Sequence, residues 1–228
     1  MRCFGKRAVL DKRIRRITNA LAENHILGNP FFIYDVVDST NDVLKRQAVV
    51  GAPEGYTVSA DQQTHGRGRM GKQWLSLKDK GLYLSVLLYP EETFADSILV
   101  NMLSAVASAR ALEKSGVNNV TLKWPNDVLA NGRKIAGILV DSGMRSDLKA
   151  YAVVGIGVNV AHDENDFRSV GEGLATSCRL EGITIACDDI LIHVLKELDV
   201  CYNIVKQGDK HWVMEEWARR SVEDVSCP

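Results

Sequence analysis

The sequence predicts an α+β fold in which a mixed, largely antiparallel sheet is backed by helices. Three or four strand-like segments follow one another between Val120 and Val160 with only tight turns between them, so helices do not alternate strictly with strands. Two long segments, 96–115 and 188–205, carry apolar residues at helical spacing on either side of this block. This order favours an antiparallel core over a doubly wound parallel sheet.

Length and composition predict one globular domain with a sizeable core. The chain has 228 residues, of which 46% are hydrophobic, and its 28 Lys+Arg nearly balance its 29 Asp+Glu. Overall charge therefore gives no reason to expect a nucleic-acid or membrane partner. The five scattered cysteines form no CxxC pair and favour reduced thiols in the cytoplasm. The five histidines show no HxH or HExxH spacing, so we expect no metal site made by the protein alone.

The first thirty residues predict a basic helix packed on the body of the protein. Seven basic side chains lie in the first sixteen residues beside one acid, Asp11, while Ile14, Ile17 and Leu21 follow helical spacing. A transit peptide or a nucleic-acid-binding helix has a similar composition, and both remain alternatives to a solvated amphipathic helix.

The remaining elements follow from periodicity and turn residues. A first strand is expected over 31–37, after the turn signal Gly28-Asn29-Pro30, and Asp38 to Asn41 supply good residues to begin a helix. Asn131-Gly132 between two apolar runs predicts a tight hairpin. The other predicted elements are strands at 56–60, 81–89, 120–124, 128–130, 134–141 and 150–160, a helix at 96–115 with Ile98 facing inward, a long helix capped by Asp188 and Asp189, and a short helix at 210–220.

The segment from Gly66 to Gly71 satisfies the pattern G-x-G-x-x-G, and Glu91-Glu92 lie about 20 residues further on, where a dinucleotide site needs an acid. Its context does not fit, because five residues separate it from the preceding strand and no helical stripe follows. The segment is better interpreted as a flexible cationic loop that binds phosphate or carboxylate through Arg67, Arg69 and Lys72. A solvated connection with incidental charge is the alternative.

A second group of unusual residues lies in the predicted hairpin. Strict alternation places Lys134, Ala136 and Ile138 on one face of the strand, and Ile135, Gly137 and Leu139 on the other. A lysine that leads an apolar strand is either a binding residue or an edge charge that prevents aggregation. A glycine within a strand indicates a bulge or a ligand close to the backbone, and the segment 155–159 (GIGVN) repeats this feature before an amide side chain.

Taken together, these motifs resemble the biotin protein ligase family in order and spacing, over roughly residues 31–220. The segments that carry the resemblance are Asp38–Asn41, Gln63–Gly71, Lys123–Asp127, Arg133–Leu139 and Gly155–Asn159. The resemblance implies a catalytic domain of the biotin/lipoate protein ligase type in a short monofunctional form. Such a domain uses ATP and Mg²⁺ to convert biotin to biotinyl-5′-AMP. It then transfers biotin to a lysine of the biotin carboxyl carrier protein of acetyl-CoA carboxylase or a similar biotin-dependent enzyme.

The resemblance also implies roles for individual residues. Lys134, Arg69 and Asp127 match the catalytic positions, and residues 64–73 form the candidate lid over the labile adenylate. Mg²⁺ is expected to bind with the ATP phosphates, not to the protein alone. The positions that match biotin contacts are Ser39, Thr40, Asn41, Gln63, Arg67, Gly68, Arg69, Lys134, Gly137 and Leu139. Those that match ATP or adenylate contacts are Arg67, Arg69, Lys72, Trp74, Lys134 and Asn159.

Two departures from the family pattern shape the remaining expectations. Too few residues precede the first strand for the winged helix-turn-helix of bifunctional members, so DNA binding is not expected. Residues 221–228 form a stub where a small C-terminal β-barrel would begin. We expect no membrane partner, and a homodimer is an open possibility. The alternatives to biotin ligation are a lipoate or octanoate–protein ligase and a non-catalytic biotin-binding regulatory protein.

Overall fold

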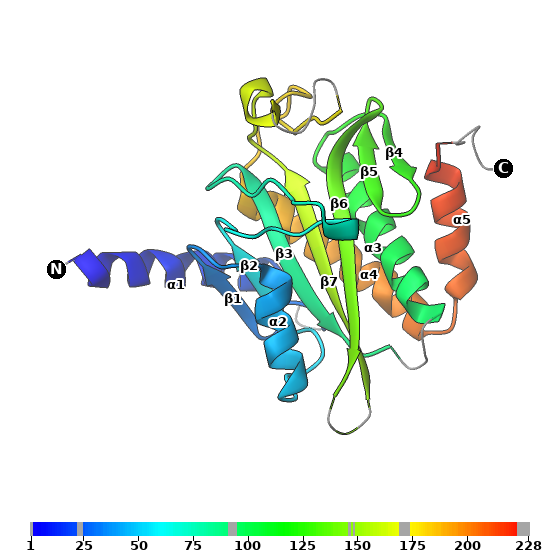
Figure 1. Ribbon diagram of the computed structural model, residues 1–228, viewed down its shortest axis with the longest axis horizontal. Coiled ribbons are helices and arrows are strands. Elements are labelled where there is room, and N and C mark those ends of the chain that lie inside the picture. Colours follow the sequence, from blue (N-terminus) through cyan, green and yellow to red (C-terminus); the bar gives the residue numbers. More distant parts are fainter. Residues whose placement is uncertain are drawn as a thin grey trace.

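A seven-stranded sheet with helices on both faces forms the body of the protein (Figure 1). The computed structural model describes residues 2–21, 25–90, 95–145, 147, 149–168 and 174–222. The strand order is β1-β2-β3-β7-β6-β5-β4. Only β1 and β2 pair in parallel, and every other neighbouring pair in the described sheet is antiparallel. The predicted α+β class with a mixed, largely antiparallel sheet is therefore confirmed.

The strands follow the predicted order, with small differences in their ends. The first predicted strand is shorter than expected, because Val37 only makes an isolated bridge with Gln63, and β6 extends three residues beyond Asp141. The strands are β1 (Phe31–Tyr34), β2 (Thr57–Ala60), β3 (Gly81–Leu88), β4 (Val120–Lys123), β5 (Asp127–Ala130), β6 (Arg133–Met144) and β7 (Ala150–Asn159).

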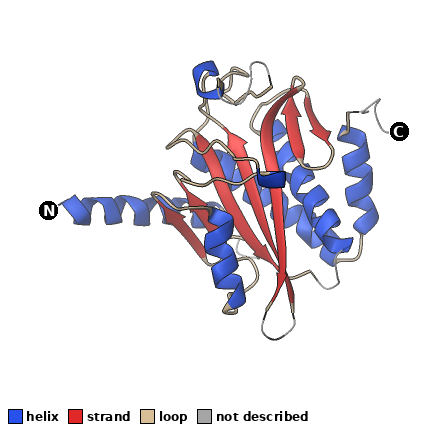
Figure 2. Cartoon of the chain, viewed as in Figure 1, coloured by secondary structure: helices blue, strands red, loops and turns tan. Residues whose placement is uncertain are grey.

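The helices divide between the two faces of the sheet, as Figure 2 shows. One face is covered by α2, which packs against β2, β3 and β7, and the other by α3 and α4, with α5 beside them. The main apolar core lies between the sheet and α3 and α4. The helices are α1 (Arg2–Ala20), α2 (Thr40–Val49), α3 (Ala95–Lys114), α4 (Cys187–Lys206) and α5 (Lys210–Arg220), with short 3₁₀ turns at η1 (Arg69–Gly71) and η2 (Glu164–Phe167).

Three local expectations differ from the structure. The N-cap of α4 is Ala186, not an aspartate. Asp188 and Asp189 lie in the first turn, where the partial positive charge of the helix end favours acids. The predicted inward residue Ile98 is half exposed. At α2 the N-cap is Ser39, as the sequence suggests, but its hydroxyl does not cap the helix.

The N-terminal helix α1 lies against β1 and α4 and projects beyond the sheet (Figure 1). Ile17 is fully buried and Ile14 and Leu21 pack against the main core. No described helix is long and apolar enough to cross a membrane. At the other end, the backbone N–H of Val222 donates to Leu122 of β4, and the rest of the predicted stub, 223–228, lies outside the described residues.

Candidate active site

Three glycines, Gly137 on β6 and Gly155 and Gly157 on β7, form a flat floor on the face of the sheet that carries α2. A Cβ on Gly155 would lie 2.3 Å from Asn41 Oδ1, and a Cβ on Gly157 would lie 2.5 Å from the Trp74 indole. A Cβ on Gly137 would lie 2.9 Å from the same indole. Gly137 and Gly157 are register partners, so both strands lack side chains at the same level. From the sequence these strand glycines indicated either a bulge or a ligand close to the backbone; in the structure the groups that approach them are side chains of the protein itself, Asn41, Trp74 and Lys134.

A bulge in β6 places Lys134 on this floor and corrects the predicted alternation. Val128 pairs with Ala136 but Leu129 pairs with Lys134, so Ile135 is an extra residue in β6. Ile135 and Ala136 consequently both lie in the main core. Lys134 lies on the same face as Gly137, with its Cε 3.2 Å from the Cβ position of that glycine. The predicted placement of Lys134 on the face of Ala136 is therefore wrong, because an extra residue reverses the period-two pattern.

Lys134, Asp127 and Trp74 gather at one end of the glycine floor. The Lys134 ammonium lies 2.6 Å from Asp127 Oδ1 and 5.3 Å from the centre of the Trp74 ring. Asp127 begins β5, directly after the turn that contains Pro125, and Asn126 ties this turn to β6 by donating its Nδ2 to the Ile138 carbonyl at 2.7 Å. The structure thus brings two predicted catalytic residues together beside a predicted nucleotide-contacting residue.

A chain of polar side chains lies at the start of α2, at the other end of the floor. Gln63 Oε1 accepts from both the backbone N–H and the hydroxyl of Thr40, at 2.8 and 3.1 Å. Ser85 Oγ lies 2.8 Å from Thr40 Oγ1 and 2.6 Å from Asn41 Oδ1. Asn41 Nδ2 donates to the Leu139 carbonyl and to Asp141 Oδ2. These residues are held in fixed orientations, which is the condition for selective binding of a polar ligand.

The cationic loop 64–73 forms an ordered turn across the same face. Arg67 and Gln73 make an antiparallel bridge, and the N–H of Trp74 donates to the Gly66 carbonyl at 2.9 Å. The loop lines a surface hollow of about 230 Å³. Its first arginine, Arg67, is ion-paired with Asp42 and Asp141. Its second, Arg69, is exposed and has no ion pair within the described chain.

Two polar groups at this site lack a partner among the described residues. Trp74 Nε1 and Arg67 Nε are buried with no hydrogen-bond partner in the described structure. A buried donor without a partner costs about 1–3 kcal/mol. An arrangement with two such groups on one surface fits a ligand that supplies the acceptors.

The carboxylate of Asp38 marks the outer edge of this cluster. It accepts hydrogen bonds from the Arg46 guanidinium and from the Ser39 backbone N–H, and these hold the pKa of Asp38 below its usual range. Its backbone carbonyl accepts from the N–H of His65 at 2.9 Å. Asp38 therefore contacts the start of α2 through its charged carboxylate and the base of the loop through its backbone carbonyl.

The other predicted residues lie around the edges of the site. Asn159 ends β7 and is nearly buried, with its Nδ2 donating to the Thr176 carbonyl at 3.0 Å. Gly68 and Lys72 form the outer rim of the loop, where the Gly68 N–H donates to the Lys72 carbonyl. Two contributing residues were missed in the sequence, Ser85 and Asp141. The available signal was that each is a polar residue within or ending an otherwise apolar strand.

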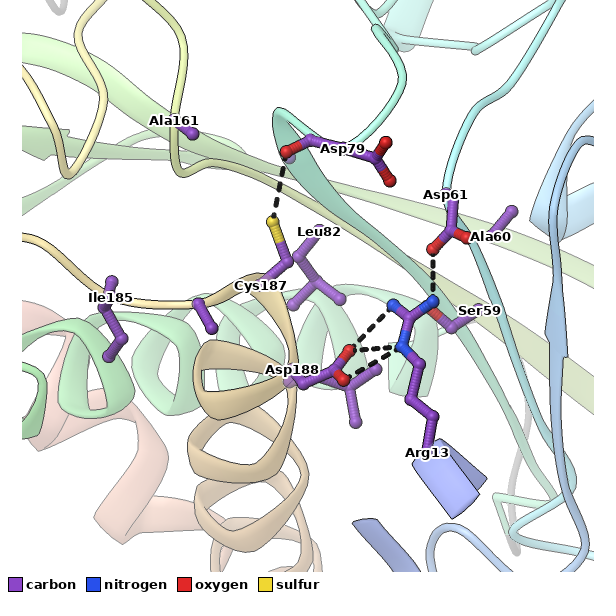
Figure 3. A pocket seen from close by; sticks show the side chains of 13 residues that line it. Arg13, Ser59, Ala60, Asp61, Asp79, Leu82, Ala161, Ile185, Cys187 and Asp188 are labelled. Carbon is purple, nitrogen blue, oxygen red and sulfur yellow. Dashed lines mark hydrogen bonds and ion pairs between the residues drawn. The ribbon is translucent and has the colours of Figure 1, made fainter. Parts of the chain in front are cut away.

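A second hollow, of about 310 Å³, lies on the face of the sheet that carries α4 (Figure 3). There Arg13 of α1 reaches Asp188 of α4 and Asp61, which follows β2, with N–O distances of 2.7 and 2.6 Å. Cys187 faces the same hollow, and burial raises the pKa of its thiol to about 11. A thiol with that pKa is protonated near neutral pH and is a poor nucleophile. We therefore assign this hollow to the attachment of α1.

The amino-acid sequence of this chain is similar to those of known ligases. The Biotin/lipoate A/B protein ligase family matches residues 33–159, more than half of the chain. The "Bifunctional ligase/repressor BirA" of Bacillus subtilis is 34% identical over 174 residues, which cover 76% of this chain and 54% of that protein. The "Biotin--[acetyl-CoA-carboxylase] ligase" of Mycobacterium tuberculosis is 35% identical over 127 residues, 54% of this chain and 46% of that protein. The chain thus spans about half the length of these relatives.

Among solved structures, the biotin protein ligase of Aquifex aeolicus in complex with biotin and ATP superposes with a TM-score of 0.71 at 30% identity. The match covers 84% of this chain and 78% of that one. The residues matched by the family model, 33–159, include β6 and β7 with the glycine floor, α2 and the cationic loop.

Proposed function

This chain belongs to the Biotin/lipoate A/B protein ligase family, and on that premise we propose that it is an ATP-dependent ligase that activates biotin as biotinyl-5′-AMP and transfers it to a lysine of a biotin carboxyl carrier protein. The observation that carries the proposal is the glycine floor. Fixed polar side chains (Thr40, Asn41, Gln63) lie at one end, and a lysine–aspartate pair lies at the other. The polar end lies at Gly155 and the lysine end lies at Gly157, two residues further along β7, so the two ends are separated by roughly 7 Å.

The first step joins two anions, and the charges at the site suit it. A carboxylate oxygen of biotin attacks the α-phosphorus of ATP, a new P–O bond forms, and the bond to the β-phosphate breaks to release pyrophosphate. A cation at the junction reduces repulsion on binding and stabilises charge at phosphorus in the transition state. Lys134 occupies that position in the proposal, since it lies on the floor beside the Trp74 ring. Arg69 and Lys72, on the exposed loop, would face the phosphates.

The second step transfers the acyl group to an amine. The lysine nitrogen of the carrier attacks the acyl carbon, an amide bond forms, AMP leaves, and the ammonium proton must be removed. We assign to Asp127 the task of orienting this lysine or accepting its proton, since its carboxylate lies beside the proposed adenylation position, 2.6 Å from Lys134. A neutral Lys134–Asp127 pair also avoids an unbalanced charge on the floor before ATP arrives.

Magnesium enters the proposal only with the nucleotide. Within the described residues no group of three His, Cys, Asp or Glu side chains is placed to hold a metal ion. In the proposal Mg²⁺ is held by the ATP phosphates, as is usual for this ion.

Lipoate or octanoate ligation is the second candidate, because the family includes lipoate ligases. The polar chain at α2 favours biotin over these acids, since the ureido ring of biotin offers two donors and an acceptor where lipoate and octanoate offer only apolar atoms. A regulatory protein that binds biotin without turnover would have no need of Lys134 on the floor.

The test is biotin-dependent release of pyrophosphate from ATP, followed by transfer to a carrier domain observed as a mass increase on one lysine. Lipoate and octanoate serve as competing acids. Adenylation of biotin but of neither competitor supports the proposal. Adenylation of lipoate in preference to biotin would replace it with the second candidate, and binding of biotin without pyrophosphate release would favour the regulatory protein.

The remaining expectations stay part of the proposal. We expect the reaction in the cytoplasm, since Cys178, Cys187 and Cys201 are free thiols. We expect the acetyl-CoA carboxylase carrier subunit or a similar protein as partner, and no DNA. A homodimer remains open and is decided by light scattering with and without biotin and ATP.

A further inference from the structure

We propose that Asp42 and Asp141 form a carboxylate latch that holds the cationic loop through Arg67, and that Asp141 is a positioning residue for the ligase reaction. The inference deepens the proposed function and rests on it for its catalytic part. It assigns the two arginines of the loop different tasks. Arg67 anchors the loop, whereas Arg69 meets the phosphates.

The geometry of the latch joins three separate elements. Arg67 Nη2 lies 3.1 Å from Asp42 Oδ1 on α2 and is hydrogen-bonded to Asp141 Oδ2 on β6. Lys45, one turn along α2 from Asp42, lies 2.7 Å from Asp42 Oδ1 and 3.7 Å from Asp141 Oδ2. The latch therefore ties the first arginine of the loop to the start of α2 and to the middle of the sheet.

The charges around Arg67 give it a different role from a phosphate-binding arginine. The latch contains two cations, Arg67 and Lys45, and two carboxylates, Asp42 and Asp141, so its net charge is zero. Arg67 is held by two carboxylates, whereas Lys134 has one carboxylate partner, Asp127, and Arg69 has no ion pair within the described chain. Arg67 is therefore less free than these two cations to attract a triphosphate. Its buried Nε–H has no partner and remains available as a single directed donor. From the sequence both loop arginines are expected to contact biotin and the nucleotide, whereas the inferred roles divide them.

A second contact links the latch to the polar end of the floor. Asp141 Oδ2, which binds Arg67, also accepts from Asn41 Nδ2 at 3.1 Å. The other hydrogen of that amide points to the Leu139 carbonyl, and its oxygen accepts from Ser85. Both donor hydrogens of Asn41 are thus used, and the amide can offer the ligand only its oxygen. Loss of the Asp141 charge would loosen the loop and the amide together.

Limited trypsin digestion tests the latch without any assumption about activity, because the loop contains cleavable bonds after Arg67, Arg69 and Lys72. The variants are Asp141→Asn and Asp42→Asn. The matched control is Asp147→Asn, which removes an aspartate that is paired with Arg145 at 3.2 Å, away from the loop. Since partly exposed ion pairs are modest, we expect cleavage within the loop to accelerate roughly three- to tenfold in both latch variants and less than twofold in the control.

The second latch variant and one further variant keep this test decisive. If Asp141→Asn lowers the melting temperature and is digested throughout, the result is read from Asp42→Asn, whose side chain is partly exposed on α2. Asp141→Glu, which keeps the charge, should restore slow cleavage. Loop cleavage in Asp42→Asn and in folded Asp141→Asn at the rate of the Asp147→Asn control would overturn the latch.

The catalytic part is read from kinetics of the full chain with biotin, ATP and a carrier domain. We expect Asp141→Asn to raise KM for biotin roughly three- to tenfold, with a smaller change in kcat. It should also raise the carrier-independent release of AMP, because a loosened loop admits water to the adenylate. A fall in kcat alone would overturn the positioning role. If the unaltered protein forms no adenylate, the proposed function fails, while the digestion result still decides whether the latch exists.

Discussion

Asn41 and Gly155 fill one small space between α2 and the sheet. The carboxamide oxygen of Asn41 would lie 2.3 Å from a Cβ on Gly155, closer than real atoms approach. The amide can reach the β6 carbonyl at Leu139 and the carboxylate of Asp141 only because β7 has no side chain at this position. The glycine thus determines the position of a polar group on a neighbouring helix.

Replacing Gly155 by alanine should therefore destabilise the fold and weaken biotin binding. Overpacking a tight site costs about 1–3 kcal/mol, and we expect that loss in the free energy of unfolding in urea. The double variant Gly155→Ala/Asn41→Ala removes the opposing amide. It should be less destabilised than the sum of the two single changes, while biotin binding stays weak. A Gly155→Ala protein that unfolds and binds biotin like the unaltered chain would contradict the close approach.

Replacing Lys134 by methionine should abolish most adenylation and leave the fold intact. Removing one electrostatic contact to a transition state costs about 10²–10³ in kcat, and this is the fall we expect in biotin-dependent pyrophosphate release. The Lys134–Asp127 pair is partly exposed, so the free energy of unfolding should change by less than about 1 kcal/mol. Lys78→Met, at an exposed lysine in the connection between β2 and β3, is the control. Unchanged turnover in Lys134→Met would remove this lysine from the mechanism.

His162 should make the fold less stable in mild acid. Its ring is fully buried against Phe167, neither nitrogen has a partner in the described structure, and burial lowers its pKa to about 4. The groups that face it are Lys80, Asp163 and Asp166, which influence it less than burial does.

The sign follows from proton uptake. The unfolded chain protonates this imidazole below its ordinary value of 6.5, whereas the folded chain does not until about pH 4. The contribution of the neutral His162 ring to the free energy of unfolding is therefore complete above about pH 6.5. It falls between pH 6.5 and 4, by up to about 1.4 kcal/mol per pH unit. Urea unfolding across this range should show a shallower pH dependence in His162→Phe than in the unaltered chain. Identical slopes would show that His162 is not responsible.

Arg13 should control the attachment of α1. It bridges Asp188 at the start of α4 and Asp61 at the base of the cationic loop (Figure 3). Arg13→Met keeps most of the apolar stem but leaves two carboxylates without their cation. We expect earlier proteolytic release of α1 and a lower melting temperature. Arg15→Met, at an exposed position on the same helix, is the control. Equal digestion of the two variants would show that apolar packing alone holds α1.

The sequence predicted the order of the elements because periodicity and turns are local signals. It could not predict the phase of β6, since the extra residue Ile135 is defined only by the pairing with β5. It also missed Asp141, whose contacts Asn41 and Arg67 lie 100 and 74 residues away along the chain. The motif residues Thr40, Gln63 and Lys134 were found through the family resemblance and their residue types, and the structure brings them to one face.

The bulge in β6 has a consequence for how this protein tolerates a deletion. Deleting Ile135 alone would leave Lys134 directly before Ala136, and strict alternation would then keep Lys134 on the face of Gly137. The deletion would remove one large apolar side chain from the main core, and truncation of such a side chain costs about 2–5 kcal/mol. Loss of this residue would thus lower the stability of the core while the lysine kept its face of the sheet.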